Sequence, residues 1–182
     1  MSLQLTLTTA SLHNVVIANE ADTIYFDIIT PEWETHLTTV RRLNTITRSF
    51  DVVGNIRNLG DKLDQPIAVS VYGREFVPAD DFLQRVGGSA SGISQWRFLD
   101  GEGGSYAWSA PTHHQVELFN VSDGMDAGRS PVAVFHPHKR YLRVGMISHH
   151  AHLEVDPSIM DSLDMVIVSL LVFERRHRAG SL

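Results

Sequence analysis

Apolar and polar residues alternate over short stretches along the first two-thirds of the chain. Leu3, Leu5 and Leu7 alternate with polar residues, and residues 23–30 are rich in β-branched and aromatic side chains. An alternation of period two is typical of a strand with one buried face. Further expected strands, separated by turn-forming residues, are 37–42, 43–50, 67–72, 96–99, 105–108, 115–121, 132–135, 141–147 and 151–155. Strands at this density predict a barrel or a sandwich rather than alternating strands and helices.

The pattern predicts a hairpin most clearly between residues 96 and 108. Residues 96–99 and 105–108 are aromatic-rich, and the Asp-Gly-Glu-Gly-Gly sequence at 100–104 separates them. Glycine adopts the positive φ angles that tight hairpin turns require. We therefore expect Trp96 and Phe98 on one face of the first strand, and Tyr106 and Trp108 on one face of the second.

The hydrophobic pattern changes near the C-terminal end. Residues 165–173 are apolar on every side except at Ser169, as in a helix that is buried all round. Asp156 and Pro157 are typical of a helix start, and basic residues at 175–178 complement its C-terminal end. We predict a core helix over about 157–178, with a strand as the alternative because of the Val-Ile-Val run. A run of nine residues is too short for a membrane span, which needs about 20 apolar residues.

Composition narrows the class of protein. A chain of 182 residues with 43% hydrophobic residues predicts one globular domain over residues 1–182. The chain has no cysteine, so disulfides, thiolate metal sites and cysteine nucleophiles are excluded. Its net charge of −6 disfavours nucleic acid as a partner. The first residues do not resemble a secretory signal, and we expect a cytoplasmic protein.

Three sets of residues resemble a known superfamily. They are Val71-Tyr72-Gly73-Arg74 with Phe82-Leu83; the 96–108 hairpin; and Leu153-Glu154-Val155 with 163–164 and 170–176. The chain is similar, over roughly residues 3–178, to an uncharacterised fungal family of the tubby-like superfamily, which includes phospholipid scramblases and LURP-one-related proteins. The resemblance implies a closed antiparallel β-barrel around a hydrophobic C-terminal helix. It implies no catalytic residues, and the absence of cysteine departs from the scramblase palmitoylation cluster.

Clustered histidines raise the alternative of a small metal-dependent enzyme. His113 and His114 are adjacent, and His150 and His152 share one face of a strand, so these four are the candidate ligands. The expected strand at 141–147 would hold the histidines at 136 and 138 roughly 23 Å from those at 149 and 150, at about 3.3 Å per residue. We therefore expect these two groups not to share an ion. The simpler interpretation is that these histidines are solvated loop residues and not metal ligands, and we expect no cofactor.

Basic residues suggest a binding function. Candidate ligand-binding residues are Arg41, Arg42, Arg48, Lys139, Arg140 and Arg143. Arg42 and Arg48 share a strand face if the strand there is unbroken, and arginine binds phosphate in a bidentate manner. Solubilising charge is the simpler explanation for these residues. The sequence therefore favours a noncatalytic binding module for an anionic lipid headgroup or a protein partner. The lipid headgroup is what the superfamily resemblance implies.

Overall fold

The computed structural model describes residues 2–60, 62–86, 95–112, 115–121, 130–141 and 147–180, with only the backbone for 139–141 and 147–149. Within them, thirteen strands form one antiparallel sheet in the order β7-β6-β5-β4-β3-β2-β1-β15-β12-β11-β10-β9-β8. These strands are β1 (Leu3–Leu7), β2 (Val15–Asn19), β3 (Ile24–Ile29), β4 (Leu37–Asn44), β5 (Ser49–Leu59), β6 (Lys62–Val71), β7 (Val77–Pro78), β8 (Gln84–Val86), β9 (Gln95–Leu99), β10 (Ser105–Thr112), β11 (Gln115–Asn120), β12 (Ala133–His136) and β15 (His152–Val155). A separate pair, β13 (Lys139–Tyr141) and β14 (Ile147–His149), forms a small second sheet.

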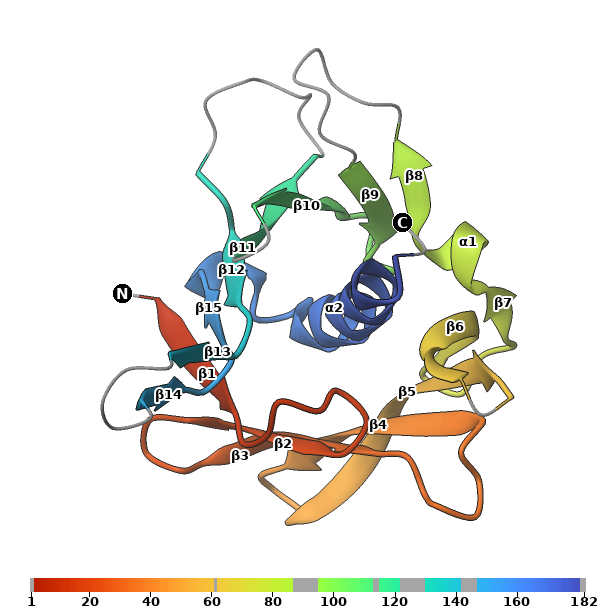
Figure 1. The fold of residues 1–182 in the computed structure, drawn as a ribbon, viewed down its shortest axis with the longest axis horizontal. Coiled ribbons are helices and arrows are strands. Elements are labelled where there is room, and N and C mark those ends of the chain that lie inside the picture. The colour runs from red at the N-terminus through yellow and green to blue at the C-terminus, as the bar shows by residue number, and fades with distance from the viewer. Residues whose placement is uncertain are drawn as a thin grey trace.

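The large sheet curls around the C-terminal helix α2 (Leu163–Arg178) without closing (Figure 1). Its edges are β7 and β8, and the short helix α1 (Ala79–Phe82) lies between them in the chain. The predicted closed barrel is therefore wrong: the architecture is a mostly-β sheet with a C-terminal helix. Pro78 ends β7 and has no backbone N–H for a further ladder bond, and the next residues turn into α1 instead of pairing with β8.

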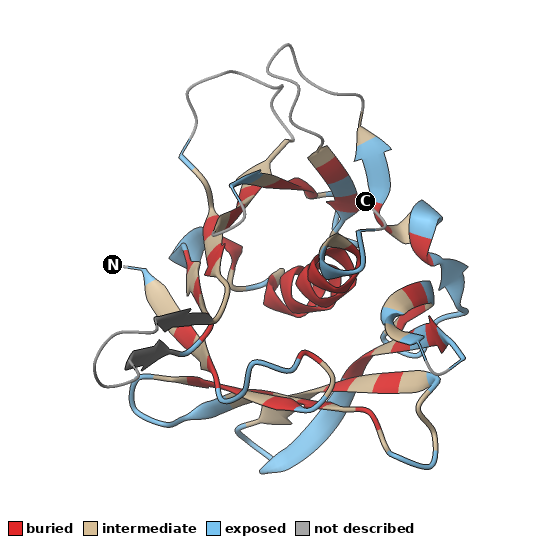
Figure 2. Ribbon diagram, in the orientation of Figure 1, coloured by how far each residue is buried: buried red, intermediate tan, exposed pale blue. Residues whose placement is uncertain are grey.

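Helix α2 is buried almost throughout, which confirms the core helix and excludes the strand alternative (Figure 2). Val166, Ile167, Leu170 and Phe173 are each no more than 2% exposed. The helix begins later than 157, because a 3-10 turn, Pro157–Ile159, precedes it. None of the described helices is long and apolar enough to cross a membrane.

Two contacts explain why the helix and the sheet approach so closely. A Cβ atom added at Gly54 on β5 would lie 2.7 Å from Val168 Cγ2, so a side chain there would force the helix or the strand to shift. Ser169, the polar residue within the apolar run, accepts a hydrogen bond of 2.9 Å from the Trp108 indole N–H and donates to the Val166 carbonyl oxygen. The buried hydroxyl thus both accepts and donates a hydrogen bond.

The aromatic hairpin is confirmed, because β9 and β10 pair with Trp96 opposite Trp108 and Phe98 opposite Tyr106. Two other predictions are wrong. The stretch 43–50 is interrupted by a turn in which Arg48 has a φ angle of 55°, so Arg48 does not share a strand with Arg42. The predicted strand at 141–147 is also wrong, because Tyr141 and Ile147 lie opposite each other in the antiparallel pair of β13 and β14.

Candidate functional site

The gap in the sheet opens into a cleft of about 820 Å³, within the usual size range of ligand pockets. It lies between the β6–β7 side and the β8–β9 side of the gap, and the start of α2 forms part of its wall. Its lining residues are Val69, Val71, Tyr72, Arg74, Glu75, Val77, Asp81, Phe82, Gln84, Arg97, Phe98, Leu99, Asp100, Gly101, Glu102, Asp161, Ser162 and Met165.

The cleft has an apolar floor and a rim rich in carboxylates. Val69, Phe98 and Met165 are core residues that reach the cleft. Five lining residues carry a carboxylate and two carry a guanidinium group; the carboxylates belong to Glu75, Asp81, Asp100, Glu102 and Asp161. All of these carboxylates except that of Asp100 belong to exposed residues. The cleft therefore has the surface chemistry of a site for an apolar group that carries positive charge.

Asp100 is the most firmly held carboxylate of the cleft. It accepts hydrogen bonds from the Ser162 hydroxyl at 2.9 Å and from the backbone N–H groups of Glu102 and Gly104 at 2.9 and 2.8 Å. Partial burial alone would raise the pKa of Asp100, but these hydrogen bonds outweigh it and hold the pKa below its ordinary value. The Tyr106 hydroxyl lies 3.3 Å from Ser162 Oγ. A permanent negative charge is thus fixed between the 100–104 turn and the start of α2.

A second carboxylate, that of Asp164, holds Tyr72 in place on the opposite wall of the cleft. It accepts hydrogen bonds from the Tyr72 hydroxyl at 3.1 Å and from Arg42 at 3.0 Å. Burial first, and then the Asp164 charge and hydrogen bond, raise the pKa of Tyr72 to about 12. Tyr72 also has a φ angle of 52°, which is uncommon for a bulky residue. Three segments distant in sequence hold its ring at the cleft.

Two of the arginines predicted as ligand-binding residues have carboxylate partners within the chain. Arg41 forms an ion pair with Asp27 and lies over the Phe50 ring, and Arg42 forms an ion pair with Asp164. Arg48 is exposed in the β4–β5 turn. Lys139 and Arg140 lie on β13, with side chains outside the described part of the structure, and Arg143 is outside the described residues. Arg41 and Arg42 are thus already engaged by carboxylates, and the anion-binding role of the three early arginines stays a prediction.

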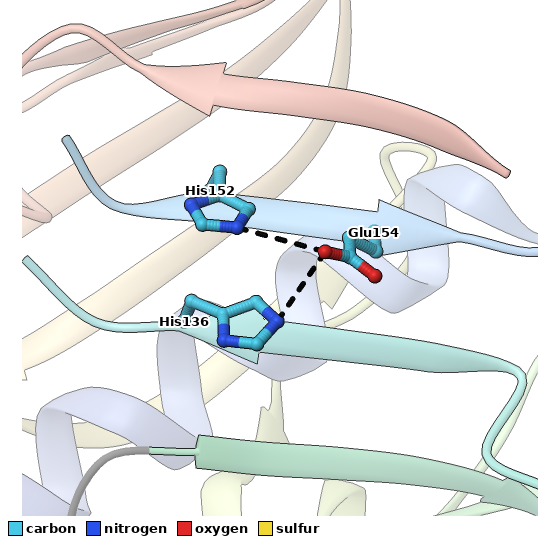
Figure 3. A group of neighbouring side chains, drawn as sticks. All are labelled: His136, His152 and Glu154. Carbon is cyan, nitrogen blue, oxygen red and sulfur yellow. Dashed lines mark ion pairs between the residues drawn. The ribbon is translucent and has the colours of Figure 1, made fainter. Parts of the chain in front are cut away.

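The histidines are arranged differently from the prediction. His113 and His114 lie outside the described residues, and His150 follows β14. His136 pairs directly with His152 across β12 and β15, with ring centroids 4.5 Å apart. The ring centroids of His138 and His150 lie 6.4 Å apart, so the predicted separation of about 23 Å between the two histidine groups is wrong. Both rings point toward Glu154 (Figure 3). These three residues are the described group with ligand atoms close enough to share a metal ion.

The spacing of the histidines in the sequence indicates which of them face each other across the hairpin. The pairs His136/His152 and His138/His150 are both centred on the same point of the chain, midway between β13 and β14. Residues opposite each other in an antiparallel hairpin always have this property. The strand expected at 141–147 implied that the chain reverses before residue 141, a few residues too early, and so separated histidines that are neighbours. The cleft carries no comparable signal, because its residues come from unconnected segments.

Comparison with known proteins places the chain in a family. The profile of a family of unknown function, DUF6593, matches residues 10–179. The chain belongs to this family. The DUF6593 match includes every residue that lines the cleft as well as the group of His136, His152 and Glu154. No curated protein and no solved structure matches the chain.

Proposed function

We propose that this DUF6593 chain is a noncatalytic binding module whose cleft receives an extended, basic and partly apolar peptide segment of a partner protein. The observation that carries the proposal is the cleft at the gap in the sheet, with its apolar floor and five carboxylates. The apolar floor supplies affinity, since burial of apolar surface contributes about 25 cal/mol per Å². The carboxylates select for positive charge, and the aromatic rings of Tyr72 and Phe82 offer faces to an ammonium or guanidinium group.

The strand edges beside the cleft favour a peptide. β7 and β8 each have one side without a strand neighbour among the described residues. Such an edge presents backbone N–H and C=O groups that an extended peptide can pair with. A peptide in the gap can therefore combine a few backbone hydrogen bonds with side chains in the cleft.

The chemistry of the cleft suits binding better than nucleophilic catalysis. Among the described residues that line it there is no histidine, and the Ser162 hydroxyl donates to Asp100 without a neighbouring imidazole. Nucleophilic serine needs an adjacent base that can take its proton. A carboxylate with a lowered pKa is a weak base.

An anionic lipid headgroup is the competing ligand of the same binding module. The tubby-like resemblance implies it, and that resemblance stays a prediction. The carboxylates of the cleft repel a phosphate group, and Arg41 and Arg42 already have carboxylate partners. We therefore favour the basic peptide.

Fluorescence anisotropy with defined peptides tests the proposal. The probes are short peptides that alternate lysine with leucine or phenylalanine, matched peptides with glutamate in place of lysine, and vesicles with and without phosphoinositides. We expect salt-sensitive binding of the lysine peptides alone. Replacing exposed Asp81 and Asp161 by lysine should weaken it about tenfold, because charges near a surface each contribute up to about 1 kcal/mol.

The matched control is the double change Glu20→Lys with Glu32→Lys. Both residues are exposed and neither lines the cleft, so the net charge changes equally while the cleft stays intact. Equal binding of the lysine and glutamate peptides, or equal loss in both double variants, would overturn the cleft as the binding site. Vesicle binding that depends on Arg41, Arg42 and Arg48 would favour the lipid headgroup instead.

A further inference from the structure

The outer face of the sheet carries a second group of chemically active side chains, away from the cleft. His136 on β12 lies opposite His152 on β15, and Glu154 follows two residues later on the same face. Phe135, next to His136, and Leu153, between His152 and Glu154, point into the core with no exposed surface. The strand pair thus holds the three polar side chains together on a rigid support. Because they face outward, replacing them leaves the packing of the core behind them unchanged.

The distances among the three side chains match a metal site. Glu154 Oε1 lies 3.6 Å from His136 Nε2 and 3.7 Å from His152 Nε2 (Figure 3), which is too long for hydrogen bonds. All three ligand atoms lie within 4.8 Å of one another. The nearest point equidistant from atoms so separated lies at most about 2.4 Å from each, and Zn–N and Zn–O bonds are about 2.0–2.2 Å. Shifts of a few tenths of an ångström would bring all three atoms to bonding distance.

A backbone carbonyl group beside His152 favours the tautomer in which Nε2, the atom facing Glu154, is a hydrogen-bond acceptor. His152 Nδ1 lies 3.4 Å from the His150 carbonyl oxygen, an arrangement that favours a proton on Nδ1. The Nε2 atom of a neutral ring then presents its lone pair toward the Glu154 carboxylate. The Nε2 lone pair and the carboxylate oxygen repel each other unless a positive charge, either a proton or a metal ion, lies between them. A backbone carbonyl that fixes the tautomer is also a common outer partner of metal-binding histidines.

We infer that His136, His152 and Glu154 bind one divalent transition-metal ion of the zinc or copper class, through the two Nε2 atoms and a carboxylate oxygen. Two imidazoles disfavour Mg²⁺ and Ca²⁺, which prefer oxygen ligands. All three side chains are partly exposed, so water completes the coordination. The site is independent of the peptide-binding cleft, and its metal-binding residues differ in part from the four histidines that the sequence suggested.

Zinc titration of the untagged protein tests this inference. Isothermal titration calorimetry with Zn²⁺ should show one site per chain, and His136→Ala, His152→Ala and Glu154→Gln should each weaken it at least tenfold. His36→Ala is the matched control, since His36 faces a single carboxylate, Glu34, at 3.8 Å, and should leave the affinity unchanged. Circular dichroism checks that every variant is folded.

A measurement on the unaltered protein avoids dependence on the variants. Histidine side-chain ¹H–¹⁵N spectra recorded with and without Zn²⁺ should shift the Nε2 resonances of two imidazoles, assigned to His136 and His152. The inference is overturned if Zn²⁺ does not bind in the micromolar range, if binding survives both histidine changes, or if the shifted resonances belong to other histidines.

Discussion

Trp108 and Ser169 join the sheet to the helix through one buried hydrogen bond of 2.9 Å, from the indole N–H to the hydroxyl oxygen. Neither residue is exposed to solvent. We expect Ser169→Ala to lower the free energy of unfolding by about 1–3 kcal/mol, because the indole N–H then stays buried without an acceptor. Urea unfolding measures the loss. In a Trp108→Phe background the same serine change should have a much smaller effect, and equal effects in both backgrounds would contradict the hydrogen bond.

Gly54 should not tolerate a side chain. Alanine there places Cβ against Val168 Cγ2, and valine is stiff at χ1, so strain of about 1–3 kcal/mol is expected in the unfolding free energy. Val168→Ala removes the colliding methyl group. The double variant Gly54→Ala with Val168→Ala should therefore be more stable than the sum of the single changes predicts. Strict additivity in urea unfolding would show that the helix does not cross β5 at this point.

Leu170→Asp should prevent folding. Leu170 is 2% exposed on the central helix, and an unpaired charge there costs about as much as the 5–15 kcal/mol that stabilises a typical domain. Far-ultraviolet circular dichroism and the melting temperature measure the result. Ile46→Asp is the control, because Ile46 is 92% exposed and the same change there should leave the melting temperature nearly unchanged. An unchanged melting temperature for Leu170→Asp would contradict the buried helix.

His13 should make the protein less stable in mild acid. Burial first, and then the positive charge of Arg175, lower the pKa of His13 below 6.5, although the negative charge of Asp64 and its hydrogen bond with His13 at 3.1 Å oppose the shift. The unfolded chain therefore binds a proton near pH 6.5 that the folded chain does not, so stability falls as the pH falls through that value. Urea unfolding at pH 7.5 and 5.5 should show this loss.

His13→Gln isolates that contribution. It should reduce the difference in unfolding free energy between the two pH values, whereas His36→Gln, which changes an exposed histidine, should preserve it. The interpretation fails if both variants keep the full difference.

Local patterns predicted the elements whose environment is encoded in adjacent residues. An all-round apolar run, preceded by the Asp156 cap that accepts a hydrogen bond from the Ser158 N–H, predicted the buried helix. The turn at 100–104 predicted the β9–β10 hairpin and its facing aromatic residues. These signals are reliable because the hydrogen bonds and faces that they depend on lie within a few residues of one another.

Tertiary structure alone decided whether the sheet closes and which residues line the cleft at its gap. The proline at the end of β7 and the turn of α1 leave the gap, but nothing near them in the chain shows that residues 97–102 and 161–165 complete its walls. In the same way, Arg42 meets Asp164 and Tyr72 meets Asp164 across long sequence separations. A single sequence records which side chains are available; the pairing of distant strands around the helix determines which of them meet.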